Sequence, residues 1–220
     1  RNQKADTATG RVPDENYARE VMQLFSIGLV QLKMDGSPTN ASNPIETYGP
    51  TDIPNLARVF TGFSWDCPDH QTAPEACFKY WGTTIRPGYT DPWTVPMRAY
   101  PQFHDGASKT FLGKTVPAQT NPMETLRLSL DIIASHSNVA PFISKQLIQR
   151  FVTSNPSTGY VTRVATTFKN SSGHLGTTIK AILMDPEARD MAALDQPGFG
   201  KVREPLLRMS ALLRAFNASS

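Results

Sequence analysis

Two groups of ionisable side chains in this sequence could carry out chemistry. His104 and Asp105 are adjacent, and Glu15, Arg19 and Glu20 lie close together near the N-terminus. A histidine beside a carboxylate can act as a base with its orienting partner, or it can ligate a divalent metal. Carboxylates at the head of an apolar helix can serve as acid–base groups or further ligands, because burial shifts their pKa. One hypothesis is therefore a hydrolase-like enzyme, metal-dependent or acid–base, that uses these five residues.

Each group also has a purely structural interpretation. His104 could bind a loop to the helices, and Asp105-Gly106 is a common turn sequence. Glu15 and Arg19 are four residues apart and could pair along a helix as a charged cap. Five arginines lie beside apolar positions of predicted helices: Arg19, Arg58, Arg150, Arg203 and Arg208. They could form buried ion pairs or bind an anion, and the sequence leaves these alternatives open.

The acidic group opens the longest apolar stretch of the chain, residues 12–33. Pro13 and Asp14 favour a helix start there, and we expect the helix to end near Met34. Apolar residues recur at three- and four-residue steps along it: Tyr17, Val21, Leu24, Phe25 and Leu29. Since the segment is apolar on nearly every side, it predicts a central, buried helix.

Further apolar periodicity, bounded by proline, glycine and capping residues, predicts the other helices. Their expected ranges are 51–62, 121–135, 139–153, 158–169, 175–184 and 202–216. Residues 64–120 are instead rich in proline and aromatic residues, and they predict an ordered excursion with short strands near 77–81 and 109–112. The predicted fold class is mainly α, an orthogonal multi-helix domain.

Length and charge limit the domain count and the partners. A chain of 220 residues can bury one core, so we expect a single domain over 1–220 with residues 1–11 as a polar arm. A net charge of +3 is too small and dispersed to favour nucleic acid. No apolar run is long enough to predict a membrane span. The sequence lacks an initiator methionine, and we expect a fragment whose partner is another protein or the remainder of its own chain.

The two cysteines of the chain lie in one loop. Cys67 and Cys77 are ten residues apart, and they predict one local disulfide. A disulfide favours an oxidising compartment, so we expect an exported protein: periplasmic, on the outer surface or secreted. The alternative is a metal site that adds His70, although the spacing differs from the tight cysteine pairs of zinc modules.

The motif DENYAREVMQLFSIGL at 14–29 resembles the signature of a bacterial family called "domain of unknown function 1800". Similar segments follow in the family's order at 56–63, 103–113, 138–148 and 203–208. Asp14 stands where the family more often has asparagine, which leaves a capping role intact. The resemblance implies a mostly helical, exported bacterial protein and implies no particular activity or cofactor.

Three functional hypotheses follow. The first is a binding or assembly role, with the aromatic excursion as contact surface. The second is the enzyme centred on His104 and Asp105, with a divalent metal as a possible cofactor. The third is a carbohydrate- or polymer-binding module that uses Trp81 and Trp93, provided that both rings face solvent. We favour the binding or assembly role.

Overall fold

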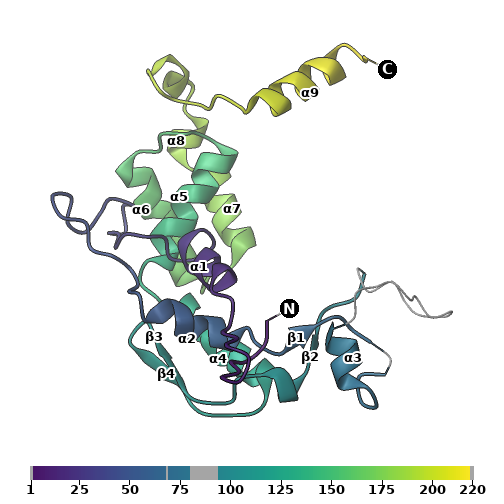
Figure 1. Cartoon of the computed structure of the whole chain (residues 1–220). Coiled ribbons are helices and arrows are strands. Elements are labelled where there is room, and N and C mark those ends of the chain that lie inside the picture. The colour runs from purple at the N-terminus through teal and green to yellow at the C-terminus, as the bar shows by residue number, and fades with distance from the viewer. Residues whose placement is uncertain (1, 68, 80–93, 219–220) are drawn as a thin grey trace. The chain divides into compact units, whose positions relative to one another are not determined.

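The computed structural model describes residues 2–67, 69–79 and 94–218 of the chain. Within these ranges helices dominate, and the strands form two small two-stranded antiparallel sheets (Figure 1). The prediction of a mainly α fold is therefore confirmed. Trp81 and Trp93 lie outside the described residues.

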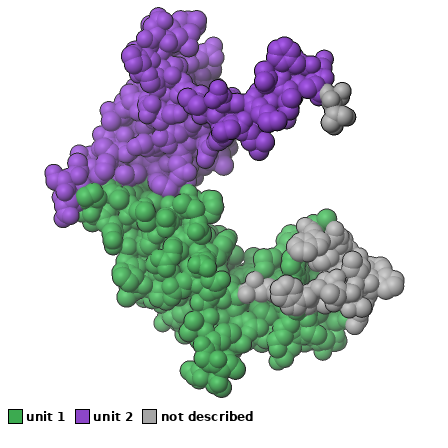
Figure 2. All heavy atoms as spheres, turned by 45° about the horizontal axis from the view of Figure 1, so that its top comes forward, with its two compact units in different colours: residues 1–31, 44–139 green, residues 32–43, 140–220 purple. Residues whose placement is uncertain are grey.

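The chain divides into two compact units. Unit 1 comprises residues 1–31 and 44–139, and unit 2 comprises residues 32–43 and 140–220 (Figure 2). Each unit has its own cluster of buried apolar side chains. The single domain expected over 1–220 stays a prediction.

Unit 1 contains four α-helices, a 3-10 helix and all the described strands. Its helices are α1 (Asn16–Gln23), α2 (Asp52–Val59), α3 (Pro74–Lys79), η1 (Pro101–Phe103) and α4 (Pro122–Ala134). Its strands are β1 (Phe63–Ser64), β2 (Arg98–Ala99), β3 (Lys109–Phe111) and β4 (Lys114–Val116). In the register of the two sheets, Phe63 lies opposite Ala99 and Lys109 lies opposite Val116.

The first helix, α1, is shorter than predicted. It ends at Gln23, after which the Ser26 hydroxyl donates to the Val21 carbonyl at 2.6 Å. The backbone N–H of Gly28 donates to the Met22 carbonyl at 2.9 Å, with Gly28 at φ +71°. A serine that bonds the backbone and a glycine in the left-handed region both favour a helix end. The prediction that the helix continues through the apolar run is wrong.

The predicted burial of this helix is also wrong. α1 buries Ala18 and Met22, the face that packs on α2. Four side chains that were expected to face inward are exposed instead: Tyr17, Leu24, Phe25 and Leu29. The apolar run does not form a central helix but a short surface helix followed by turns.

Helix α2 is the centre of unit 1 and confirms the helix predicted at 51–62. It buries Ile53, Leu56, Ala57 and Val59, and it packs against α1, β3 and α4. The chain then turns at Gly62, which has φ +84°. A Cβ atom at this position would lie 2.9 Å from the backbone nitrogen of His104 and from the Tyr100 carbonyl oxygen. Glycine is therefore required where the chain leaves α2.

A buried asparagine, Asn138, holds the turns that follow α1 against the end of unit 1. The Asn138 side-chain amide donates to the Ile27 carbonyl at 2.8 Å and to the Val30 carbonyl at 2.7 Å. These carbonyls have left the helical pattern, so they need another donor when buried. One side chain thus joins the end of the unit's first stretch, residues 1–31, to the end of its second, residues 44–139.

The excursion at 64–120 has its own small aromatic cluster. Cys67 and Cys77 form a disulfide, and Phe78, Tyr100 and Phe103 pack beside it. The strand predicted near 77–81 is wrong in its described part, because residues 77–79 belong to α3, which Pro74 begins. The strand predicted at 109–112 is confirmed by β3.

Unit 2 is a helical unit. Its elements are α5 (Val139–Phe151, whose first residue belongs to unit 1), α6 (Thr158–Asn170), α7 (Leu175–Met184), α8 (Pro186–Arg189), η2 (Met191–Asp195) and α9 (Pro205–Ala215). The bounds of α5, α6, α7 and α9 lie within three residues of the four helices predicted from 139 onward, whereas α8 and η2 were not predicted. The core consists of Ile148, Tyr160, Val161, Val164 and Ile182. Among the described residues, no helix has the length and apolar character needed to cross a membrane.

Candidate functional site

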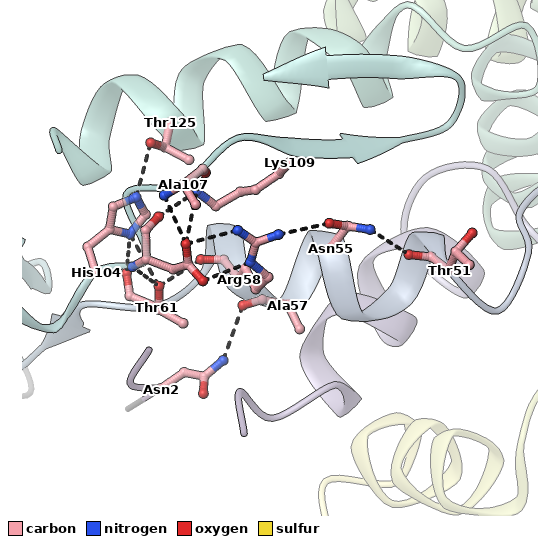
Figure 3. Close-up of polar contacts among 11 residues, drawn as sticks. Asn2, Thr51, Asn55, Ala57, Arg58, Thr61, His104, Ala107, Lys109 and Thr125 are labelled. Atoms are coloured by element: carbon pink, nitrogen blue, oxygen red, sulfur yellow. Dashed lines mark hydrogen bonds and ion pairs between the residues drawn. The ribbon is translucent and has the colours of Figure 1, made fainter. Parts of the chain in front are cut away.

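His104 and Asp105, two of the five residues predicted to do chemistry, lie in a polar cluster of unit 1 (Figure 3). We call this cluster the polar hub, and its members are Arg58, Thr61, His104, Asp105, Lys109 and Thr125. Arg58 lies in the last turn of α2, and Thr61 lies in the turn that follows it. His104 and Asp105 come directly after η1, Lys109 begins β3, and Thr125 lies on α4.

Arg58 and Asp105 form a two-pronged ion pair. Arg58 Nε donates to Asp105 Oδ2 at 2.7 Å, and Arg58 Nη2 donates to Asp105 Oδ1 at 3.0 Å. Burial alone would raise the pKa of Asp105, but the hydrogen bonds from Arg58 and from the Ala107 N–H hold it below its usual range. The carboxylate is therefore ionised at neutral pH, with both of its oxygens bonded inside the protein.

Lys109 is the most deeply buried charge of the hub. Its side chain is 0% exposed, and Nζ donates to the carbonyls of Ala107, at 2.8 Å, and Asp105. Nζ also lies 4.0 Å from the Asp105 carboxylate. Burial lowers the pKa of Lys109 to about 8, with the attraction of Asp105 opposing this shift. The amino group is held by carbonyl oxygens of the turn before β3.

Both ring nitrogens of His104 have protein partners. Nδ1 lies 2.8 Å from the Thr61 carbonyl oxygen, and Nε2 lies 3.0 Å from Thr125 Oγ1. A carbonyl oxygen can only accept, so we assign the proton to Nδ1, which leaves Nε2 to accept from the threonine hydroxyl. Burial lowers the pKa of His104, which favours this neutral ring. Both nitrogens of this buried ring are thus directed at protein atoms.

The acidic residues of α1 do not join the hub. Glu15 and Glu20 are exposed, and Glu15 lies 3.8 Å from Arg19, the pair expected along the helix. The hydrogen bonds and ion pairs of the hub do not include these three residues. Across the residues that the structure describes, no three His, Cys, Asp or Glu side chains are grouped so that they could hold a metal.

The sequence singled out His104, Asp105 and Arg58 but not Lys109. The pattern Lys109-Thr110-Phe111 held a usable signal, because alternate residues of a strand face the same side. Phe111 is an apolar residue suited to the core, so this alternation could have placed Lys109 on the inward face with it. Both are fully buried in the structure.

A second candidate region of unit 1 is a concave apolar pocket with a volume of about 500 Å³. We call it the apolar hollow. It is lined by Tyr17, Phe60, Phe63, Met97, Met123 and Leu126, together with the polar residues Asn2 and Asp14. The rings of Tyr17 and Phe60 meet edge to face with centroids 4.8 Å apart. Tyr17, Met97 and Met123 are each more than half exposed, so these apolar side chains are accessible.

Unit 2 has a candidate surface of the opposite shape, the convex helix α9. This helix has no buried residue. Leu206, Met209, Leu213 and Phe216 recur at steps of three and four, and all four are exposed. Its lone ion pair among the described residues is at the N-terminal end, where Glu204 lies 3.2 Å from Arg150.

Comparison with known proteins identifies a family. No curated protein and no solved structure matches the chain. A family model with the description "Protein of unknown function (DUF1800)" matches residues 1–220. The match covers the whole chain, including the motif at 14–29, the hub residues and α9. The protein therefore belongs to the DUF1800 family.

Proposed function

We propose that this chain is a binding protein and that unit 1 uses the apolar hollow to hold apolar side chains of a protein partner. The observation that carries the proposal is the hollow itself, about 500 Å³ in size and lined by aromatic and methionine side chains that solvent can reach. This size is typical of sites that hold a ligand, about 300–1,000 Å³.

The chemistry of the lining favours a protein partner. Met97 and Met123 are flexible and polarisable, and methionines of this kind adapt to the shape of apolar partners. Tyr17 and Phe60 add rigid aromatic surface, which is enriched at protein interfaces. Asp14 supplies one carboxylate beside this surface. The lining thus combines an apolar centre with a single charge that can orient the partner.

The polar hub gives less support to catalysis. A catalytic base or a metal ligand needs a lone pair directed at its target. In the hub the Asp105 carboxylate accepts from Arg58, His104 Nδ1 donates to the Thr61 carbonyl, and His104 Nε2 faces Thr125 Oγ1. The hub is better explained as the structure that fixes α2, β3 and α4 relative to one another. That fixed arrangement includes Phe60 and Leu126 of the hollow.

We also propose that the protein works outside the cytoplasm. The disulfide between Cys67 and Cys77 supports this location, since disulfides persist in oxidising compartments. Trapping free thiols with an alkylating reagent in intact cells, followed by mass spectrometry, tests the proposal. Unmodified, disulfide-linked cysteines are expected, and two alkylated thiols would contradict it.

Binding of the uncharged dye Nile red tests the hollow. We expect saturable binding with increased emission, and binding at least tenfold weaker in the variant Met123→Glu, which places a charge in the lining. Leu175→Glu is the matched control, because Leu175 is equally exposed but lies on α7. If Met123→Glu and Leu175→Glu bind the dye as tightly as the unmodified chain, the hollow is not the binding surface.

A further inference from the structure

We infer that the partner held in the apolar hollow is helix α9 from a second copy of this chain. The inference rests on the proposed binding function and adds the identity of the occupant. It follows from three observations: the spacing and exposure of the apolar residues of α9, the shape of the hollow, and the opposite charges of the two surfaces.

Helix α9 has the features of a helix that docks into a groove. Leu206, Met209, Leu213 and Phe216 stand at positions i, i+3, i+7 and i+10, the spacing of anchors along one helical face. Their exposed fractions are 75%, 60%, 44% and 76%. A helix of eleven residues is marginal in water on its own. A surface that covers this face is therefore needed to stabilise the helix.

The apolar hollow offers the complementary shape. It is concave, and its exposed methionines, Met97 and Met123, can adapt to leucine and phenylalanine side chains. The edge-to-face pair of Tyr17 and Phe60 forms a rigid part of its lining. A convex stripe of large apolar side chains is the kind of ligand that such a lining holds.

The charges of the two surfaces are opposite. Among the described residues that line the hollow, Asp14 carries the charge, −1. Residues 203–214 contain three arginines and Glu204, a net charge of +2. Arg208 and Arg214 lie on the same helix as the apolar stripe of α9. Opposite charges around an apolar contact favour association and fix its orientation.

A helix donated by one copy to unit 1 of another makes a contact between two different surfaces. Reciprocal exchange closes this contact into a dimer, and one-way exchange extends it into a chain of copies. Both arrangements make the association depend on protein concentration, and both require α9 and the hollow at once.

A peptide experiment tests the pairing directly. The probe is a fluorescein-labelled peptide of residues 203–217, titrated with the full chain that carries Leu206→Glu and Leu213→Glu, so that its own α9 cannot compete. We expect saturable binding by fluorescence anisotropy. The same two substitutions in the peptide, or Met123→Glu in the chain, are expected to weaken binding at least tenfold. Leu175→Glu in the chain is the control and is expected to change it less than twofold.

Sedimentation velocity of the full chain tests the second copy. We expect the unmodified chain and the Leu175→Glu control to associate as concentration rises, and the Leu206→Glu/Leu213→Glu chain to remain monomeric. Peptide binding with a strictly monomeric unmodified chain would overturn the inference, because α9 would then occupy the hollow of its own chain.

The two proposals can fail separately. If the peptide does not bind while Nile red still binds in a Met123-dependent way, α9 is not the occupant and the binding function stands. If Nile red does not bind either, both proposals are wrong. Far-ultraviolet circular dichroism of each variant confirms that the substituted chain is folded.

Discussion

The polar hub and helix α9 are opposite departures from the usual distribution of side chains. In the hub, Lys109 is fully buried, Arg58 and Asp105 are partly buried, and the protein supplies the partners of all three. In α9, large apolar side chains are exposed, and none is buried. One region has charge inside, and the other has hydrocarbon outside.

The difference teaches how to separate structure from function in a protein of unknown activity. Burying a charge costs free energy unless the charge is paired. The charges of the hub are paired with one another and with backbone groups, so a structural role is sufficient to account for them. Exposed apolar surface on a short helix has no such internal explanation. Helix α9, whose apolar side chains are left exposed, is therefore the better candidate for a functional surface. Four measurements test this comparison between the hub and α9.

The largest effect is expected from Asp105→Asn. The change keeps the shape of the side chain but removes the charge that compensates Arg58 and the buried Lys109. Leaving a buried charge uncompensated costs about 3–5 kcal/mol of unfolding free energy. Urea denaturation at pH 7 measures this loss. Asp131→Asn is the matched control, since Asp131 pairs with Arg127 on the surface. Equal losses in the two variants would remove the distinction between hub and surface.

The second effect concerns Lys109 and alkaline pH. Burial lowers the pKa of Lys109 to about 8, below the value of about 10.5 expected in the unfolded chain. Above pH 8 the unfolded chain therefore binds more protons than the folded one, so the unfolding free energy rises with pH. We expect a gain of about 1–2 kcal/mol between pH 8 and 9.5.

The variant Lys109→Met isolates this slope. It is less stable at every pH, because the carbonyls of Asp105 and Ala107 lose their donor, but its unfolding free energy is expected to be nearly flat from pH 8 to 9.5. Lys114→Met is the control, since Lys114 is exposed on β4. If Lys109→Met shows the same rise as Lys114→Met, the buried amino group is not its source.

A smaller effect is expected from His104 in mild acid. Burial lowers the pKa of His104, so the unfolded chain takes up the proton first as pH falls below about 6.5. The unfolding free energy should therefore fall as the pH decreases from 6.5 to 5. In His104→Gln the decline is expected to be shallower, although a decline from His136 remains, because burial also lowers its pKa. An identical slope in the variant and the unmodified chain would show that His104 is not buried as a neutral ring.

The smallest effect on stability is expected in α9. At a concentration too low for association, Leu206→Glu/Leu213→Glu should change the unfolding free energy by less than about 0.5 kcal/mol, because both side chains are exposed. Ile148→Ala provides the contrast in the same unit, since Ile148 is fully buried and its truncation costs about 2–5 kcal/mol. A large loss in the α9 variant would show that α9 is part of the folded core.

The sequence predicted most of the helices because their signals are local. Asn121 and Pro122 begin α4, and the Asn121 side chain accepts hydrogen bonds from the N–H groups of Met123 and Glu124. The apolar run after α1 led to a wrong prediction of a helix as far as Met34. The helix ends at Gln23, and the turns at Ser26 and Gly28 follow within the apolar run. The apolar content of residues 12–33 predicted burial on nearly every side. In the structure, the contact with α2 determines that Ala18 and Met22 are the residues of α1 that are buried.

The candidate sites were harder to predict, because they join residues that are distant in the sequence. The pairing of Arg58 with Asp105 spans 47 residues, and only the available charges suggested it. The apolar hollow brings Tyr17, Phe60, Met97 and Met123 together from separate elements. No spacing rule connects such positions, so the hollow could not be inferred from the sequence.

The buried amide of Asn138 has a consequence for the time at which the chain can fold. Its two hydrogen bonds reach back 111 and 108 residues, to the carbonyls of Ile27 and Val30. Ribosomes add about 5–20 residues per second, so the segment that follows α1 waits roughly 5–20 s for this partner. During that interval its backbone is bonded to water, and unit 1 closes only after Asn138 has been made.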